Sequence, residues 1–374
     1  MSTKTKKNII FYCSSISWGG LEMNTVRYAA WMRDCGYNVK LLCVASSPIH
    51  LKSKDFQIDV TLVTRNRKYF DLVNAFKIAK IIDDLNADVV WFRDTRDMSL
   101  LSWVKKIASR KFKLLYFQAM QLGVEKKDFF HTARFAAIDF WISTLDFLKH
   151  QVLEKTKVRE QSIHVIPIGV DQTLLEKNLV EKKEAKRQLG LDINKTTIAI
   201  IGRIDPLKGQ HILINAAQLL HRDDFEILIV GESTRNESNR YEVELKQKIR
   251  SLGMQGTIFF KPYSDNVALY YSATDIFVMA SKGETFGTVT IEAMSFGIPV
   301  IGTNSSGTPE LLDYGKSGLL FEPDNAEELS QKLRLLLDES SLREEIGAKG
   351  KRRFLSCYSK QASIDAFINL IEKN

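Results

Sequence analysis

Residues 281–310 read SKGETFGTVTIEAMSFGIPVIGTNSSGTPE, and this stretch decides how the rest of the chain is interpreted. It contains two carboxylates, Glu284 and Glu292, in the pattern Glu-x7-Glu. Thr285 is expected to cap a mostly apolar helix over 288–296, and the glycine and proline that follow are expected to end it. The pattern therefore predicts two carboxylates held close to one turn of the chain.

The surroundings of the two carboxylates suggest what they bind. Burying a bare charge among apolar neighbours costs on the order of several kcal/mol, so Glu292 on the apolar helix needs hydrogen-bond donors or a cation. A ribose diol would supply two hydroxyl donors side by side. Glu284 lies on the loop before the helix, where it could bind a second polyol.

A second polar loop precedes this stretch. Residues 196–201 are expected to form a buried strand, which is followed by Gly-Arg-x4-Lys-Gly and a helix over 210–220. Arg203 and Lys208 in this loop make a cation site for a diphosphate, because a guanidinium binds two oxygens and a lysine adds a point charge. The N-terminus of the following helix adds partial positive charge.

These motifs resemble the donor site of a known enzyme family. The segments ETFG, EAMSFGIPVIGT and GTPELL, with Gly-Arg-x4-Lys-Gly, are similar to the retaining glycosyltransferase family 4. The resemblance implies that Glu284 contacts the donor sugar and Glu292 the nucleotide ribose. It assigns the diphosphate to Arg203 and Lys208, so Glu284, Arg203 and Lys208 are the catalytic candidates. It covers nearly the whole chain and implies the GT-B fold, in which two Rossmann-like doubly wound domains face a central cleft.

Further donor-binding candidates lie on three other turns. The first expected strand is followed by a loop that ends in Gly19 and Gly20 before a helix. Two glycines let the backbone approach an anion at a helix N-terminus, and in the family this loop faces the donor phosphates and the acceptor. The loop has neither a G-x-G-x-x-G nor a P-loop pattern, which argues against a dinucleotide oxidoreductase. The remaining candidates are Tyr263, after a strand where the nucleobase would lie, and Gly287 and Thr288.

Strands and helices alternate along the chain, as in a parallel doubly wound sheet. Strands are expected over 8–13, 38–44, 57–62, 88–92, 113–117, 138–142 and 163–166 in the first half, and over 196–201, 225–230, 257–260, 275–279 and 299–302 in the second. We expect three parts: an N-terminal acceptor-binding domain over 1–175, a C-terminal nucleotide-sugar-binding domain over 176–355, and a last helix over 356–374 that crosses back to the first domain.

The acceptor is expected beyond the carboxyl ends of the strands of the first domain, where ligands of such sheets bind. Arg93, Asp94, Arg96 and Asp97 follow one strand, residues 118–121 follow the next, and all of these are candidates for acceptor contact. Many family members carry a histidine in the loop after this second strand, whereas the nearest histidine here is His131 in the next helix. The acceptor-side candidates are therefore Arg93, Gln118 and His131. The alternatives are an ion pair of the arginine with Asp94 in its own loop and a structural role for the histidine.

Positive charge is concentrated in the first half of the chain. Of the net +8, residues 1–178 hold 28 Lys+Arg against 18 Asp+Glu. This excess suggests an anionic partner, such as a membrane surface or a phosphorylated lipid or glycan. A merely solvated helix face is the alternative for the densest cluster, which consists of Lys105, Lys106, Arg110, Lys111 and Lys113. The charge is accompanied by no RNA or DNA motif, so nucleic acid is not an expected partner.

The sequence also bears on location and cofactors. It shows no secretory signal, no membrane-spanning run and no metal-ligand spacing of its four cysteines. We therefore expect a cytoplasmic protein that is either soluble or peripheral at the inner face of the cell membrane. Because no Asp-x-Asp occurs, a metal-clamped diphosphate is not expected, and neither is a cofactor besides the donor substrate.

The motifs and the resemblance together predict a retaining, metal-independent glycosyltransferase. It would move a hexose-type sugar from a nucleoside-diphosphate sugar to a glycan or lipid-linked acceptor, in cell-surface polysaccharide or glycoconjugate synthesis. Two alternatives use the same donor site. One is a sugar-nucleotide epimerase of the same fold, which would need acids and bases in the cleft, and the other is a non-catalytic nucleotide-sugar-binding protein.

Overall fold

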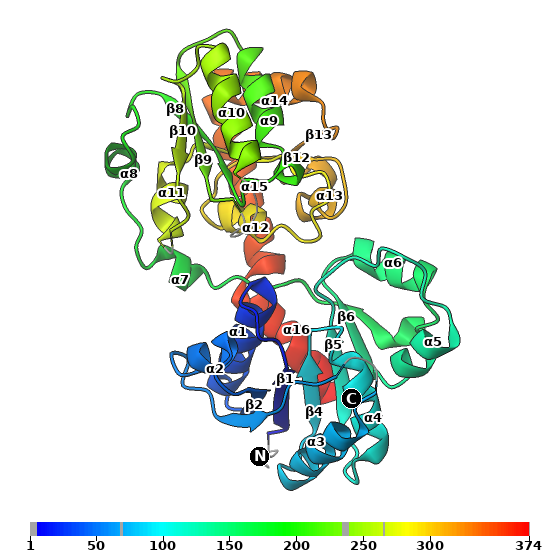
Figure 1. Ribbon diagram of the computed structural model, residues 1–374. Coiled ribbons are helices and arrows are strands. Elements are labelled where there is room, and N and C mark those ends of the chain that lie inside the picture. Colours follow the sequence, from blue (N-terminus) through cyan, green and yellow to red (C-terminus); the bar gives the residue numbers. More distant parts are fainter. Residues whose placement is uncertain (1–5, 68–69, 234–238, 265, 374) are drawn as a thin grey trace. The chain divides into compact units, whose positions relative to one another are not determined.

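The computed structural model in Figure 1 describes residues 6–67, 70–233, 239–264 and 266–373. The chain divides into two compact units. The first comprises the residues up to Pro167 together with those from Ile364 onward, and the second comprises Ile168–Ser363. Each unit is built on one parallel sheet, which confirms the predicted pair of Rossmann-like doubly wound domains.

The sheet of the first unit has seven parallel strands in the order β3-β2-β1-β4-β5-β6-β7. The strands are β1 (Asn8–Cys13), β2 (Asn38–Val44), β3 (Val60–Val63), β4 (Val89–Phe92), β5 (Lys113–Phe117), β6 (Phe140–Ser143) and β7 (Ile163–Val165). The helices are α1 (Gly20–Asp34), α2 (Pro48–Ser53), α3 (Leu72–Asp84), α4 (Met98–Ile107), α5 (Phe129–Phe135), α6 (Asp146–Lys155) and most of α16 (Lys360–Lys373). The strand order reverses between the neighbours β1 and β4, and this is the topological switch point of the sheet.

Alternate side chains of these strands point to opposite faces and form two apolar layers. On one face the strands pack against α3 and α4, which lie side by side in Figure 1 and whose buried residues include Ile78 and Leu101. On the other face the ring centroid of Tyr28 in α1 lies 5.4 Å from that of Phe117 in β5 and 5.3 Å from that of Phe367 in α16. The end of the chain therefore belongs to the core of the first unit.

The sheet of the second unit has six parallel strands in the order β10-β9-β8-β11-β12-β13, with its switch point between β8 and β11. The strands are β8 (Thr196–Ile201), β9 (Phe225–Val230), β10 (Ile258–Lys261), β11 (Ile276–Met279), β12 (Val300–Thr303) and β13 (Leu319–Phe321). The helices are α7 (Gln172–Glu176), α8 (Lys182–Leu189), the 3-10 helix η2 (Pro206–Lys208), α9 (Gln210–Gln218), α10 (Arg240–Ser251), α11 (Val267–Ala273), α12 (Thr288–Ser295), α13 (Thr308–Leu311), α14 (Ala326–Asp338) and α15 (Ser340–Arg353).

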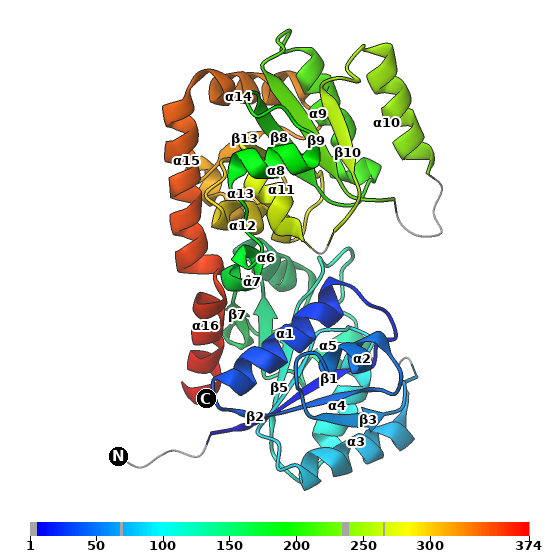
Figure 2. The ribbon, with the colours of Figure 1, turned by 90° about the vertical axis from the view of Figure 1, so that its left-hand side faces the viewer.

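Helices cover both faces of this second sheet, as Figure 2 shows for α9 and α10 on one face and α11 and α12 on the other. Leu213 of α9 and Leu245 of α10 are buried in one cluster with strand residues such as Ile227. On the opposite face the ring of Tyr271 in α11 lies 6.2 Å from that of Phe277 in β11. The six strands are therefore buried between two helical layers. Because both faces of the sheet are covered, polar side chains that bind a ligand are expected at the ends of the strands.

Local backbone geometry explains two departures from the predicted elements. β3 begins at Val60 and not at residue 57, because Gln57 has a left-handed backbone with φ +52°, which a strand does not accommodate. β13 was not predicted, since it is only three residues long and gives too little alternation to recognise.

The boundaries between the units also differ from the prediction. The backbone N–H of Val170 donates to the carbonyl oxygen of Tyr358 at 2.9 Å, and the N–H of Lys360 donates to that of Val170 at 2.9 Å. These hydrogen bonds fasten the segment after Pro167 to the second unit. The boundary therefore lies at 167/168 and not after 175, and the chain returns to the first unit at 363/364 and not at 356.

Candidate functional site

Three of the predicted residues lie at the switch point of the second sheet. Arg203 and Lys208 are on the loop that follows β8, and Glu284 is on the loop that follows its neighbour β11. Because the strands are parallel, both loops leave the same edge of the sheet. Open parallel sheets bind their ligands at this place, beyond the carboxyl ends of the strands.

The loop after β8 is shaped by Asp205 and Gly209. Asp205 begins η2 by accepting a hydrogen bond at 2.9 Å from the backbone N–H of Leu207. Gly209 ends η2 with φ +73°, a left-handed conformation that favours glycine. A Cβ atom on Gly209 would lie 2.3 Å from the carbonyl oxygen of Ala280, just after β11. The glycine therefore lets the loop that carries Lys208 approach the end of β11.

Glu284 is held by its backbone and contacts Lys208 through its side chain. Its carbonyl oxygen accepts a hydrogen bond at 3.1 Å from the N–H of Gly307. The Nζ atom of Lys208 lies 2.6 Å from Oε2 of Glu284, and 26% and 18% of the two side chains are exposed. The fold thus joins the predicted lysine and the predicted glutamate, from two separate loops, in a partly buried ion pair.

The helix after Glu284 begins differently from the prediction. Gly287, and not Thr285, is the N-cap of α12, and no side chain of the described residues caps this helix. Gly287 has φ +69°, and a Cβ atom there would lie 3.0 Å from Cγ of Glu284 and 3.3 Å from Oγ1 of Thr290. The glycine therefore turns the chain where a capping side chain was expected, and it brings the start of α12 close to Glu284.

The other donor-side candidates of this unit are less constrained. Arg203 is 60% exposed on its side chain, and its Nη2 atom lies 3.8 Å from Oδ2 of Asp205. Thr288 is the first residue of α12 and is partly buried, whereas Tyr263 is 58% exposed on the segment after β10. The donor contacts of Arg203, Thr288 and Tyr263 stay predictions.

Glu292 lies on α12 and has a hydroxyl partner within the protein. Its Oε2 atom accepts a hydrogen bond at 2.8 Å from the hydroxyl of Tyr271 on α11. Tyr271 is buried, and its ring stacks on that of Phe296 at 5.1 Å. Burial, together with the Glu292 carboxylate, raises the pKa of Tyr271 well above its usual value, so the hydroxyl keeps its proton and donates it. Part of the donor requirement predicted for Glu292 is thus supplied by Tyr271.

In the first unit, the two predicted glycines lie at the start of α1. Gly19 is the N-cap, Gly20 is the first helical residue, and a Cβ atom on Gly20 would meet no atom within 4 Å. The first turn also carries the buried Glu22, whose carboxylate accepts a hydrogen bond from Ser15 at 2.5 Å. A carboxylate at this helix end competes with a second anion. The donor contact of Gly19 and Gly20 stays a prediction.

Gln118 has a structural role in this unit, and its contact with an acceptor stays a prediction. Its side chain is fully buried. Its Oε1 atom accepts hydrogen bonds from Trp141 at 3.1 Å and from Ser143 at 3.0 Å, and its Nε2 atom donates to the carbonyl oxygen of Met120 at 2.9 Å. The amide thus joins the end of β5 to β6. The sequence places Gln118 directly after a strand but does not reveal these partners.

His131 also serves the structure of its own helix. Its backbone N–H donates to Oδ1 of Asp128 at 3.0 Å, and its Nδ1 atom contacts Oδ2 of the same carboxylate. Asp128 is the N-cap of α5, and its hydrogen bonds to the backbone and side chain of His131 hold its pKa below the usual value. This contact is the structural role given above as the alternative for His131, and its contact with an acceptor stays a prediction.

Arg93 is buried without the ion pair that was its alternative role. Its guanidinium carbon lies 4.4 Å from the ring centroid of Phe117, and its Nε and Nη1 atoms have no hydrogen-bond partner among the described residues. Burial lowers the pKa of Arg93 to about 10. Asp94 instead accepts a hydrogen bond from the backbone N–H of Arg96 at 2.9 Å. A contact of Arg93 with the acceptor stays a prediction.

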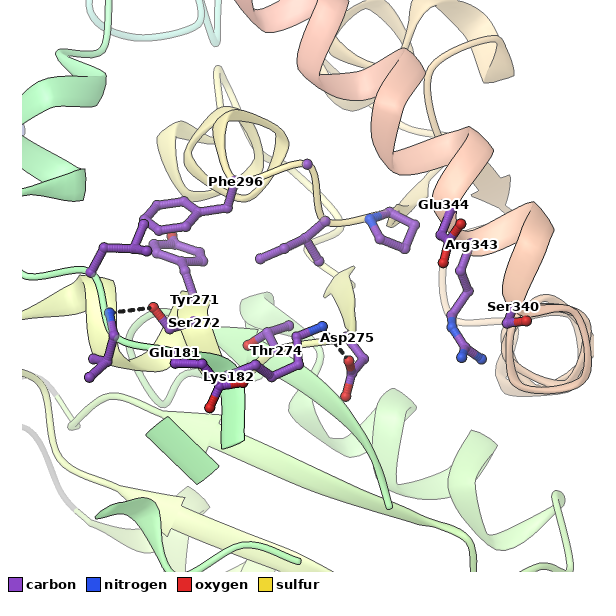
Figure 3. Close-up of a pocket in the computed structure, with 15 residues that line it drawn as sticks. Glu181, Lys182, Tyr271, Ser272, Thr274, Asp275, Phe296, Ser340, Arg343 and Glu344 are labelled. Atoms are coloured by element: carbon purple, nitrogen blue, oxygen red, sulfur yellow. Dashed lines mark hydrogen bonds and ion pairs between the residues drawn. The ribbon is translucent and has the colours of Figure 1, made fainter. Parts of the chain in front are cut away.

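A cavity of about 450 Å³ lies at the opposite end of the second sheet (Figure 3). Asp275, which precedes β11, and Pro299, which precedes β12, line it. Lys182 reaches Asp275 with an ion pair of 2.6 Å, drawn as a dashed line in Figure 3. The predicted donor residues follow their strands, so this cavity is not where they meet.

The chain is similar to known glycosyltransferases. Residues 181–353 match the family of glycosyl transferases group 1. An uncharacterized glycosyltransferase of Haemophilus influenzae is 25% identical over 90% of this chain and 92% of its own length. The capsular polysaccharide biosynthesis glycosyltransferase CapM of Staphylococcus aureus is 28% identical over 61% of this chain and 60% of its own length.

The whole chain also has the fold of a solved structure. HepE of Anabaena, crystallised in complex with UDP, superposes with a TM-score of 0.82 over 98% of this chain and 100% of its own. The two sequences are 20% identical, so this structural similarity is evidence for the fold alone. Together with the two doubly wound sheets, it confirms the predicted GT-B fold.

Proposed function

The match of residues 181–353 supports glycosyl transferases group 1 as the family of this chain, and from this premise we propose a retaining, metal-independent hexosyltransferase of family 4. It takes the sugar from a nucleoside-diphosphate sugar and transfers it to a glycan or lipid-linked acceptor. The likeness to CapM supports a role in cell-surface polysaccharide or glycoconjugate synthesis. The observation that carries the proposal is the contact of Lys208 with Glu284 at the switch point of the second sheet.

In this proposal the donor takes over both partners of the ion pair. The ammonium of Lys208 binds diphosphate oxygens and the carboxylate of Glu284 accepts from sugar hydroxyls. When the bond from the anomeric carbon to the phosphate oxygen breaks, Lys208 and Arg203 stabilise the negative charge that grows on the diphosphate, each by on the order of 3 kcal/mol. The acceptor hydroxyl attacks from the face that the diphosphate leaves and gives its proton to a phosphate oxygen, so the configuration is retained.

A thermal-shift screen of the purified chain against UDP-, GDP- and ADP-sugars, each with and without EDTA, tests the donor part. A ligand that binds only the folded chain adds about 2.7 kcal/mol to the free energy of unfolding at a hundred times its Kd. We expect one nucleotide class to raise the melting temperature, and EDTA to leave this shift unchanged. A shift that EDTA abolishes, or no shift with any class, would contradict the proposal.

Product analysis then separates the two alternative functions. An epimerase converts the nucleotide sugar into an isomer without any acceptor, and a binding protein leaves it intact with every acceptor. The proposed transferase releases the nucleoside diphosphate and forms a new glycosidic bond of the same anomeric configuration as the donor, which nuclear magnetic resonance of the product reports.

We also propose a peripheral position at the inner face of the cell membrane, although not through the cluster singled out in the sequence. Lys105 lies 2.6 Å from Asp139, and Arg110 lies 2.6 Å from Asp88, so these two cations are paired within the protein. Lys106 lies instead on a part of the surface that also carries Trp103. In the part of the chain that the structure describes, no helix has both the length and the apolar character to cross a bilayer.

This other surface, which we call the aromatic patch, consists of Phe70, Trp103, Lys106, Phe129 and Phe130. Its three phenylalanines are 66%, 79% and 71% exposed, and Nζ of Lys106 lies 5.0 Å from the ring centroid of Trp103. The patch lines a cavity of about 690 Å³. Exposed rings beside cations are typical of surfaces that enter the interface of a membrane with anionic lipids. We therefore assign the membrane contact to this patch.

Replacing Phe129 and Phe130 with serine is expected to weaken binding to vesicles of phosphatidylcholine and phosphatidylglycerol about tenfold or more. Each ring that enters the interface contributes on the order of 1 kcal/mol, and cosedimentation measures the loss. Leu51→Ser with Leu174→Ser removes side chains of 56% and 53% exposure elsewhere and should leave binding unchanged. Equal binding of the wild type and the Phe129→Ser/Phe130→Ser variant would refute the membrane contact and point to a protein partner.

A further inference from the structure

A third cavity, of about 470 Å³, lies in the first unit and includes Asp94 and Arg96, which follow a strand where the acceptor is expected. We call it the arginine pocket. It is lined by Ser14 and Ser15 after β1, by residues 65–67 after β3, and by Asp94 and Arg96 after β4. These are the carboxyl ends of parallel strands, and β1 and β4 meet at the switch point of the first sheet. The pocket therefore lies where open parallel sheets bind ligands.

Hydrogen bonds between the three loops fix the floor of the arginine pocket. The hydroxyl of Ser14 lies 2.5 Å from Oδ1 of Asn66 and also contacts the carboxyl group of Asp97. The Nδ2 atom of Asn66 donates to the carbonyl oxygen of Arg96 at 3.0 Å. The backbone N–H of Ser14 also donates to Oδ2 of Asp97 at 3.2 Å, and burial raises the pKa of this carboxyl group to about 7. The floor is thus built before any ligand binds.

The walls of the arginine pocket carry an excess of positive charge. Among the described residues, Arg65, Arg67 and Arg96 line it together with one carboxylate, that of Asp94. The Nε atom of Arg96 lies 3.4 Å from Oδ2 of Asp94, which offsets one of the three cations. Arg65 and Arg67 are exposed, and within the described ranges neither takes part in an ion pair. Two guanidinium groups therefore remain available to an anion.

We propose that the arginine pocket binds the acceptor through an oxyanion, either a phosphate or a carboxylate. A guanidinium presents parallel N–H donors that match these groups bidentately. The buried hydroxyl of Ser14 and the amide of Asn66 add polar groups of the kind that orient sugar hydroxyls, and the volume is that of a small-molecule site. That the ligand is the acceptor rests on the proposed function, whereas its negative charge is inferred from the pocket alone.

The test uses the whole 374-residue chain with Arg203→Gln and Lys208→Gln, which removes the cations assigned to the donor diphosphate. Calorimetry measures binding of glucose 6-phosphate, glucuronate and glucose, so the two anions separate phosphate from carboxylate recognition. At least one anion should bind about tenfold more tightly than glucose. Adding Arg65→Gln, Arg67→Gln and Arg96→Gln should weaken its binding about tenfold or more.

A charge-matched control carries Lys54→Gln, Lys157→Gln and Arg159→Gln, three exposed cations of the first unit outside the pocket, and should bind like its parent. Melting temperatures report folding, and Arg67→Gln alone repeats the test if the triple variant does not fold. Unchanged affinity after loss of the pocket arginines, or equal binding of glucose and both anions, overturns the proposal. Nucleotide binding is measured separately on the wild type. A failure of the proposed donor site can therefore be distinguished from a failure of anion binding in the arginine pocket.

Discussion

Replacing Lys208 with glutamine is expected to lower the kcat of glycosyl transfer about a hundredfold or more, because the leaving diphosphate loses a preorganised cation. Glu284→Gln should act in the same direction, since the sugar loses its carboxylate. Both are measured as initial rates of nucleotide release from the donor that the thermal-shift screen identifies. The matched control is Lys246→Gln on α10, because Lys246 is also ion-paired, at 2.5 Å from Glu242, and should keep the wild-type rate.

A double variant distinguishes this catalytic role from a purely structural one. Lys208→Gln alone leaves a partly buried carboxylate without its cation, which should lower the free energy of unfolding by about 1 to 2 kcal/mol. Lys208→Gln combined with Glu284→Gln replaces the pair by two neutral amides and should recover most of this stability while remaining inactive. Recovery of activity together with stability would show that the ion pair only supports the fold.

Replacing Glu292 with alanine is expected to weaken nucleotide binding about ten- to a hundredfold. The carboxylate is proposed to accept hydrogen bonds from the ribose hydroxyls, and a charge-assisted hydrogen bond contributes about 1.5 to 3 kcal/mol. Isothermal titration with the free nucleoside diphosphate measures the effect, because this ligand contains the ribose but not the sugar that Glu284 is proposed to bind.

Tyr271→Phe is the control for this second prediction. It removes the hydroxyl that lies 2.8 Å from Glu292 and keeps the carboxylate and the stacked ring. We expect less than about a threefold change in nucleotide affinity. An equal loss in Tyr271→Phe and Glu292→Ala would assign the effect to the packing of α11 against α12, and an unchanged affinity in Glu292→Ala would rule out the ribose contact.

The donor side of the site was largely predictable because its residues belong to local patterns. Gly-Arg-x4-Lys-Gly follows a buried strand directly, and Glu284 lies on the short loop before a helix, so the loops that carry these groups follow from the pattern of strands and helices. The contact between Lys208 and Glu284 was not predictable in the same way. It depends on the close approach of Gly209 to Ala280, two residues that belong to separate strand–loop units.

The sequence did not reveal the surroundings of a side chain where distant residues determine them. Gln118 follows a strand as a ligand would, but Trp141 and Ser143, which belong to the next strand, occupy its side chain. Thr285 has the chemistry of an N-cap, whereas the left-handed glycine at 287 begins the helix instead. Neither packing partners nor positive φ angles are visible in a single sequence with many glycines.

The arginine pocket was predicted only in part: Asp94 and Arg96 were candidates for acceptor contact, whereas its other lining residues come from loops that lie far apart in the chain. The sequence feature that belongs to this pocket is the Arg-x-Arg pattern of Arg65 and Arg67, which follows an expected strand. That pattern alone does not distinguish a binding site from solvated cations. Only the strand order, which places the ends of β1 and β4 next to each other, brings Arg96 and the serines after β1 to the same cavity.

Under the proposed function, the ion pair of Lys208 and Glu284 also favours release of the product. The intact donor offers phosphate oxygens to the lysine and sugar hydroxyls to the glutamate, so both charges find partners. After transfer, the remaining nucleoside diphosphate offers nothing to Glu284 and competes with it for Lys208. The carboxylate thereby acts as an internal competitor of the spent nucleotide, which limits product inhibition and keeps successive turnovers fast.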